Sequence, residues 1–129
     1  FAVLNESNEL IGECSIEFYD EEGNYTEYED FTNTQLINQR ELWIGFGLRP
    51  DLVGKGIGPS FVEACVTFAI QHFEYLGSYI YLGVATFNQR ALKAYQKSGF
   101  EIFETKMDEI NGQPLECAFM RRENNQATS

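Results

Sequence analysis

Residues 48–60 read LRPDLVGKGIGPS, and this stretch decides how the rest of the chain can fold. Three glycines alternate over residues 54–58, directly before an apolar run of helical spacing that starts at Pro59. Glycine lets a backbone bend and approach a ligand closely, and the free N–H groups and dipole of a helix start attract phosphate. Lys55 adds a positive charge. The stretch predicts a turn that holds phosphate; a glycine-rich connection without a ligand is the alternative.

Two common phosphate-binding motifs do not fit this turn. The P-loop requires GxxxxGK[ST], which the turn does not supply. The dinucleotide fingerprint GxGxxG requires glycine at the position that Pro59 occupies. If the turn holds phosphate, the ligand is therefore one that neither motif describes.

The clearest helix of the chain follows the turn, and we predict it over Pro59–Leu76. Pro59 suits the first helical position because its missing N–H is no loss there, and Gly77 is expected to end the helix. Apolar residues recur at helical spacing at Phe61, Cys65, Phe68, Ala69, His72, Phe73 and Leu76.

Apolar runs on both sides of this helix predict strands at Glu41–Leu48, stopped by Pro50, and at Tyr79–Ala85. A strand, a helix and a second strand in this order form a parallel pair with a crossover helix. Further elements are expected at Phe1–Leu4, Leu10–Phe18, Gln89–Ser98 (a helix capped by Asn88 and closed by Gly99), Phe100–Met107 and Leu115–Met120, with a hairpin turn at Asn111-Gly112. Residues Tyr25–Asn38 predict a loop, with a short strand or helical turn inside it as the alternative.

The fold class that these elements predict is α/β. We expect a single mixed sheet with a central parallel strand pair, a crossover helix, flanking antiparallel hairpins, and helices on its faces. The length of 129 residues suits one domain, which we place at residues 1–123, followed by a polar tail at 124–129.

The charge balance limits the partners. There are 20 acidic and 9 basic residues, a formal net charge of -11. Such a surface repels nucleic-acid backbones and anionic membranes and favours a cationic partner, such as an amine or a basic peptide. Solubility alone is the alternative explanation of the charge.

The histidine count excludes a His-rich metal site, and the cysteines indicate free thiols. Cys14, Cys65 and Cys117 form no CxxC pair and lie in apolar runs, which is typical of buried, reduced thiols in a cytosolic protein. His72 is the only histidine, so no His-rich metal site is possible. Because no secretory signal or membrane span is visible, a cytoplasmic location is predicted.

A second motif lies downstream, where residues 88–100 read NQRALKAYQKSGF. Together with the glycine turn it resembles the GNAT family of N-acetyltransferases. The first signature of that family is the coenzyme A-binding motif R/Q-x-x-G-x-G/A, and the second is an Asn, then A-x-x-x-Y, then G-F. Both occur here in the family's order, although Val53 stands where the family usually has Arg or Gln.

The resemblance implies the acyl-CoA N-acyltransferase fold and acetyl-CoA as the cofactor. Family members usually begin with a strand and two helices that this chain lacks, so we expect the domain to be incomplete at its N-terminus. The pantetheine arm is expected beside the end of the strand before the turn, where Gly45 and Gly47 are consistent with a strand that leaves its neighbour. The implied cofactor-binding residues are Leu48, Val53, Gly54, Lys55, Gly56, Ile57, Gly58, Ser60 and Asn88.

Tyr95 is the candidate general acid for such a reaction. It follows Asn88 by two helical turns, so both side chains face the same side, and a phenol stays protonated at neutral pH. Packing in the core is the alternative role. Glu41 is the candidate general base, directly or through water, with an exposed strand-end carboxylate as the alternative. Trp43 shares its strand face and either walls an acceptor pocket or belongs to the core.

The predicted function is N-acetyltransfer from acetyl-CoA to a primary amine of a small molecule or peptide by direct transfer. A non-catalytic acyl-CoA-binding or regulatory module is the alternative. The charge disfavours a nucleic-acid-binding domain, and neither nucleic acid nor membrane is expected as a partner. A homodimer is possible because family members are frequently dimers.

Overall fold

The computed structural model describes residues 1–20, 25–26, 41–54, 56 and 58–124. Most of the loop predicted over Tyr25–Asn38, Lys55 and Ile57 of the glycine turn, and residues 125–129 of the predicted tail lie outside this part. The elements are β1 (Ala2–Leu4), β2 (Leu10–Tyr19), β3 (Tyr25–Thr26), β4 (Glu41–Leu48), the 3-10 helix η2 (Pro50–Leu52), α2 (Gly58–His72), β5 (Tyr79–Ala85), α3 (Gln89–Lys97), β6 (Glu101–Ile110) and β7 (Gln113–Glu123).

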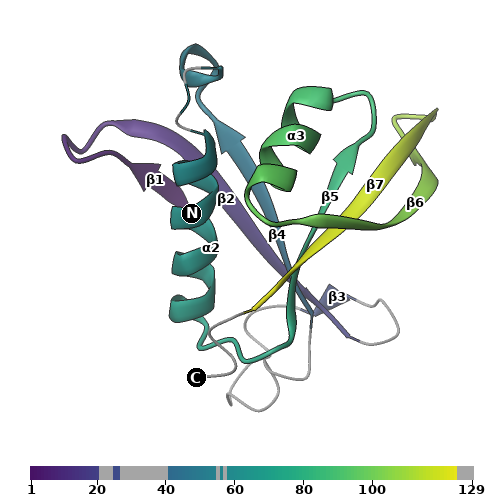
Figure 1. The fold of residues 1–129 in the computed structure, drawn as a ribbon, viewed down its shortest axis with the longest axis horizontal. Coiled ribbons are helices and arrows are strands. Elements are labelled where there is room, and N and C mark those ends of the chain that lie inside the picture. The colour runs from purple at the N-terminus through teal and green to yellow at the C-terminus, as the bar shows by residue number, and fades with distance from the viewer. Residues whose placement is uncertain (21–24, 27–40, 55, 57, 125–129) are drawn as a thin grey trace.

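The described strands form one mixed sheet in the order β1-β2-β4-β5-β7-β6, with β3 pairing with β2 at its side (Figure 1). β4 and β5 are parallel, whereas the other pairs are antiparallel. The predicted central parallel pair and flanking hairpins are confirmed. The predicted bounds of β4 and β5 agree with the structure, because uninterrupted apolar runs that end at turn residues mark buried strands well.

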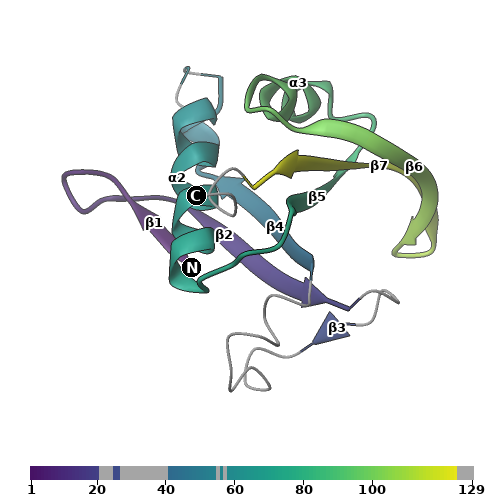
Figure 2. The same cartoon turned by 60° about the horizontal axis from the view of Figure 1, so that its bottom comes forward.

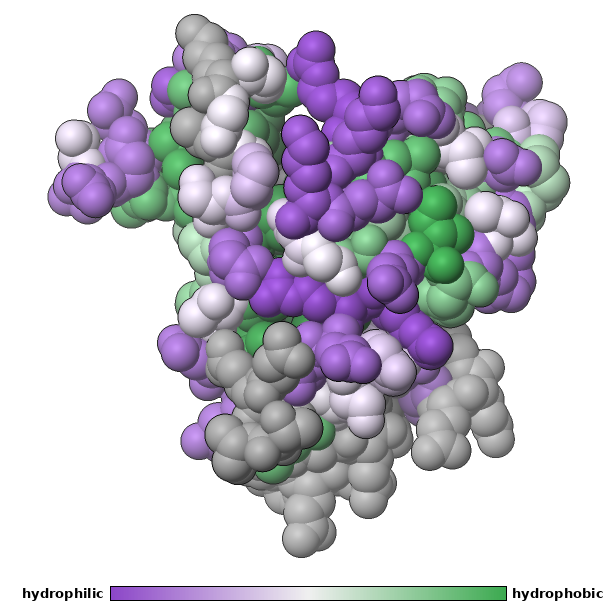
Figure 3. Space-filling view, viewed as in Figure 1, coloured by the Kyte–Doolittle hydropathy of each residue, from purple (hydrophilic) through white to green (hydrophobic). Residues whose placement is uncertain are grey.

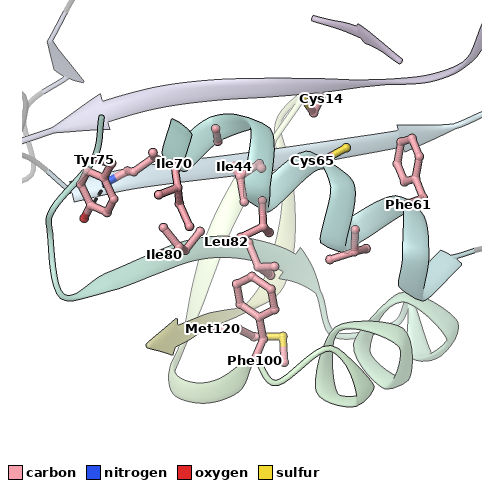
Figure 4. Close-up of a cluster of buried hydrophobic side chains, with 14 of the residues drawn as sticks. Cys14, Ile44, Phe61, Cys65, Ile70, Tyr75, Ile80, Leu82, Phe100 and Met120 are labelled. Carbon is pink, nitrogen blue, oxygen red and sulfur yellow. Dashed lines mark hydrogen bonds between the residues drawn. The ribbon is translucent and has the colours of Figure 1, made fainter. Parts of the chain in front are cut away.

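Both helices pack on the same face of the sheet, not on opposite faces (Figures 1 and 2). Phe46 of β4 lies 6.3 Å from the ring of Phe61 in α2 and 5.5 Å from the ring of Tyr95 in α3. The core between helices and sheet takes every second residue of the strands (Figure 4). Leu42 and Ile80, cross-strand neighbours in β4 and β5, are fully buried there.

α2 ends at His72, four residues before the predicted end at Leu76, and Gly77 does not close it. Glu74 takes the left-handed conformation instead, with φ of 52°. The cause is Tyr75, which is buried and whose hydroxyl donates to the carbonyl of Tyr79 at 2.8 Å. Because this contact turns the chain back into the core, Leu76 is exposed. Phe68 and His72 of the predicted apolar stripe are exposed as well.

α3 and the final hairpin follow the prediction closely. Asn88 caps α3 by accepting a hydrogen bond from the N–H of Ala91, and Gly99 has the positive φ expected of a helix end. Asn111 and Gly112 both have positive φ, as the predicted hairpin turn requires. β6 and β7 are longer than predicted because their pairing continues up to this turn. Asn124, assigned to the tail, is 3% exposed and belongs to the fold.

The three cysteines are free thiols, as predicted, with Cys14 and Cys65 buried and Cys117 half-buried. Burial raises the pKa of the Cys65 thiol to about 12. In the described part of the chain, no three His, Cys, Asp or Glu side chains gather as a possible metal site. Among the same residues, no helix has the length and hydrophobicity needed to cross a membrane.

Candidate functional site

The parallel strands β4 and β5 separate after their first residues. Their pairing is confined to Leu42 with Ile80 and Trp43 with Tyr81, whereas β4 pairs with β2 along its whole length. Figure 1 shows the two strands diverging towards their carboxyl ends. From Ile44 onwards, β4 makes no pairing with β5 in the part of the chain that the structure describes, so its edge can offer backbone N–H and C=O groups to a ligand. The predicted separation near Gly45 and Gly47 is confirmed.

The glycine turn leads from the end of β4 through η2 into α2. Gly54 and Gly56 have φ of 80° and 82°, which side-chain-bearing residues rarely adopt. A Cβ added at Gly56 would have no atom within 4 Å, so this glycine serves the backbone conformation and an open approach rather than close packing. The first N–H groups of α2 then follow at Gly58, with Pro59 in the first turn.

A pocket of about 660 Å³ lies between the end of β4, the glycine turn, the start of α2 and α3. Its walls are largely apolar, with Phe46, Phe61 and Val62 among them. Ser60 lies in the first turn of α2 and is exposed, but it is not among the lining residues. The structure brings most of the predicted site residues together here: Leu48, Val53, Gly54, Gly56, Gly58, Asn88 and Tyr95 all line the pocket.

Asn88 and Tyr95 share this wall, as the two-turn spacing predicts. The side-chain oxygen of Asn88 accepts from the N–H of Ala91 at 3.2 Å, which leaves its amide nitrogen as the group that can donate to a ligand. The half-buried Tyr95 lies between the rings of Phe46 and Phe100. Burial raises the pKa of its hydroxyl, which makes no hydrogen bond within the described part of the chain. Tyr95 therefore packs beside the pocket, and its raised pKa favours the protonated hydroxyl.

Three basic side chains on the same wall were not predicted from the sequence. Arg90, Lys93 and Lys97 of α3 all line the pocket, in a chain with only 9 basic residues. A Cβ at Gly54 would lie 3.4 Å from Nη1 of Arg90, so this guanidinium stands directly against the glycine turn. Hydrophilic side chains gather over α3 (Figure 3). The available signal was this concentration of basic residues in one helix of an acidic chain.

Glu41 and Trp43 lie on the opposite face of the sheet, apart from Tyr95. They line a second pocket, of about 420 Å³, which also reaches Gly45 and Gly83 beside the gap between β4 and β5. Trp43 Nε1 donates to Glu41 Oε1 at 3.4 Å. Four residues of a strand span about 13 Å, so Glu41 lies this far along β4 from Gly45. The role of Glu41 as a base stays a prediction.

Residues 1–100 match the model of the Acetyltransferase (GNAT) family, which is more than half of the chain. The chain therefore belongs to the GNAT acetyltransferase family. None of the curated proteins matches it in sequence.

Solved structures with the same fold are GNAT acetyltransferases of low sequence identity. A mutant of the spermidine N-acetyltransferase SpeG from Vibrio cholerae has a TM-score of 0.69 and 19% identity, over 98% of this chain and 66% of its own. Spermidine N-acetyltransferase from Vibrio cholerae in complex with CoA and spermine has a TM-score of 0.69 and 20% identity, over 100% and 67%. A putative phosphinothricin N-acetyltransferase has a TM-score of 0.64 and 14% identity, over 95% and 68%. The chain thus spans about two thirds of the length of these neighbours.

Proposed function

We propose that this chain binds acetyl-CoA in the pocket beside α3 and transfers its acetyl group to a primary amine that enters from the opposite face. The observation that carries this proposal is the gap between β4 and β5. One pocket lies on the helix side of the gap and contains Phe46 and Leu48. The other lies on the far side and contains Gly45 and Gly83. Two reactants held in these pockets would meet at β4, which is the positioning that acyl transfer requires.

The helix-side pocket fits the parts of coenzyme A. The positive φ of Gly54 and Gly56 and the start of α2 form a backbone cradle for a pyrophosphate. Arg90, beside Gly54, supplies a cationic contact that Val53 cannot make. The free edge of β4 near Leu48 and the amide nitrogen of Asn88 are placed to hydrogen-bond the pantetheine arm. Lys55, Ile57 and Ser60 remain proposed contacts from the family motif.

Backbone groups of β4 and the side chain of Tyr95 would then act in the acetyl transfer itself. Acetyl-CoA, when bound, supplies an activated acetyl thioester. Backbone N–H groups of β4 beyond Trp43 orient and polarise its carbonyl. The Tyr95 hydroxyl, kept protonated by its raised pKa, donates to the sulfur as the thiolate leaves. This position of Tyr95, beside the gap, favours catalysis over a module that only binds coenzyme A.

The amine must lose a proton before it attacks. Glu41 lies too far along β4 for direct contact, so we propose that water in the second pocket carries the proton towards its carboxylate. The titles of the neighbours name spermidine and a complex with CoA and spermine, which supports a small-molecule amine as the acceptor over a peptide. A homodimer and a cytoplasmic location stay predictions.

A thiol-release assay tests the proposal. The wild-type chain is incubated with acetyl-CoA and a panel of monoamines, polyamines, amino acids and peptides, and the acetylated product is identified by mass spectrometry. We expect coenzyme A release that depends on at least one small amine and matches product formation mole for mole. Binding of acetyl-CoA without acetylation of any amine would instead assign the chain to the non-catalytic class.

A further inference from the structure

The second pocket pairs carboxylates with aromatic rings across two strands. In the β2–β4 register Glu17 lies opposite Trp43, and Tyr19 lies opposite Glu41. Cross-strand partners point to the same face of a sheet, so these four side chains form a square in which acid and aromatic alternate. All four line the pocket. We call Glu17, Tyr19 and Trp43 the Glu17–Trp43 site.

The indole of Trp43 is held in place by its neighbours. Tyr81 of β5 stacks on it at 5.2 Å and 20°, and Tyr19 meets it edge-on at 6.0 Å. Its N–H donates to Glu41. Tyr81 thus covers the indole from the β5 side, whereas Glu17 comes from the strand on the other side. Trp43 is half-buried, so part of its ring remains open to the pocket.

The carboxylate of Glu17 can accept a further hydrogen bond or ion pair from a ligand. Its Oε2 accepts from the Tyr19 hydroxyl at 2.6 Å, and its carboxylate makes no ion pair within the described part of the chain. Of the described residues that line this pocket, none is a lysine or arginine. A carboxylate beside an open aromatic ring attracts an organic ammonium both by charge and by the ring quadrupole.

The same face of the sheet already binds a cation of the chain itself. The guanidinium of Arg121 lies 4.3 Å from the centre of the Tyr79 ring and 5.3 Å from that of Phe103. Arg121 therefore covers the aromatic rings of this face that lie next to β7. The Glu17–Trp43 site offers similar chemistry, and among the described residues that line its pocket there is no basic side chain.

We propose that the Glu17–Trp43 site binds a second ammonium group of the acceptor, which makes the substrate a diamine or polyamine rather than a monoamine. The proposal rests on the proposed function, since it places the reacting amine at the gap beside Gly45. Trp43 and Gly45 lie two residues apart on one face of β4, a spacing of about 7 Å. A short alkyl chain between two amino groups spans this distance. Glu17 and Trp43 are therefore specificity residues, and the acetyl group goes to the amine that they do not hold.

A matched pair of substrates tests this site. Diaminobutane and butylamine have the same carbon chain and differ only in the second amino group. We expect the wild-type kcat/KM for diaminobutane to exceed that for butylamine by about tenfold, equivalent to about 1.4 kcal/mol. Glu17→Gln should remove this preference, mainly by raising the KM for diaminobutane. Glu109→Gln, which removes the same charge from an exposed position in β6, is the control and should keep the preference.

The single tryptophan of the chain gives a readout that does not depend on turnover, because Trp43 belongs to the site. Diaminobutane should change the Trp43 fluorescence saturably, with or without coenzyme A present, whereas butylamine at the same concentrations should not, and Glu17→Gln should abolish the response. Saturation without acetylation of any amine would support the cation site and reject the proposed function. Equal kcat/KM for the two amines, or equal fluorescence responses in wild type and Glu17→Gln, would overturn the cation site while leaving acetyl transfer intact.

Discussion

The two faces of the sheet differ in burial and in side-chain chemistry. Adjacent residues of β4 show this difference. Leu42 points into the helix-covered face and is 0% exposed, whereas Trp43 points to the other face and lines a pocket. The covered face is apolar and closely packed and holds the glycine turn beside it. The opposite face carries carboxylates and aromatic rings. Stability should therefore depend on one face and recognition of the amine on the other, with the gap between β4 and β5 joining them.

The largest expected effect is on the covered face. Leu42→Ala should lower the free energy of unfolding by about 2–5 kcal/mol, because it leaves a cavity in the core. Glu17→Gln, on the open face, should stay within about 0.5 kcal/mol of wild type. Urea denaturation of both variants checks the contrast. Similar losses in the two would mean that the faces do not divide stability and recognition as described.

Tyr95→Phe probes the point at which the faces meet. Removing the hydroxyl should lower kcat by about 100-fold, the smaller end of the range for general acid catalysis. Affinity for acetyl-CoA should persist, because the ring still packs between Phe46 and Phe100. Steady-state kinetics and calorimetry measure the two quantities. Unchanged turnover would leave Tyr95 a packing residue only.

Tyr75, buried on the helix-covered face, should make the stability of the fold depend on pH. Burial raises the pKa of its hydroxyl to about 12, against about 10 in an unfolded chain. The folded state therefore favours the protonated form. This stabilisation is complete below about pH 10 and is lost as the pH rises towards 12, by about 2 kcal/mol. Tyr81 and Tyr95, whose pKa values burial also raises, contribute in the same direction.

Tyr75→Phe should make the unfolding free energy less dependent on pH in this alkaline range. The variant also loses the hydrogen bond to the Tyr79 carbonyl, which lowers its stability at neutral pH. Urea midpoints measured from about pH 8 to about pH 11 follow both changes. The same alkaline loss in the variant as in wild type would exclude Tyr75 as a source.

The smallest predicted effect concerns Arg90. Arg90→Ala should weaken acetyl-CoA binding about tenfold, about 1.4 kcal/mol, because the guanidinium beside Gly54 no longer meets the pyrophosphate. The remaining affinity should depend less on salt. Lys106→Ala, which removes a cation in β6 outside this pocket, is the control. If both variants bind acetyl-CoA alike, Arg90 does not replace the side chain missing at Val53.

The covered face could be predicted well from the sequence, because helix periodicity and apolar runs determine it. β4 and β5 were located with their observed bounds, and Asn88 and Gly99 marked the ends of α3. The end of α2 was missed because it depends on Tyr75, whose hydrogen-bond partners lie in other elements. Local sequence contains no trace of such tertiary contacts.

The site could be predicted in part. The glycine turn, Asn88 and Tyr95 were predicted from the resemblance to the two motifs of the family, and the structure gathers them in one pocket. Glu17 was missed because its position opposite Trp43 depends on the β2–β4 register, which no turn within the described residues specifies. Arg90 was missed because a concentration of basic residues in one helix does not indicate which of them lies against the glycine turn. Its position beside Gly54 follows only from the three-dimensional structure.

The most direct test of a cofactor site at the glycine turn compares two glycines with similar positive φ. Gly56 in the turn and Gly112 in the β6–β7 hairpin have φ of 82° and 77°, and an added Cβ meets no atom within 4 Å at either. Calorimetric titration should show saturable acetyl-CoA binding to wild type and Gly112→Ala, and at least tenfold weaker binding, about 1.4 kcal/mol, to Gly56→Ala. No binding to wild type, or equal binding to the two variants, would contradict a cofactor site at the glycine turn.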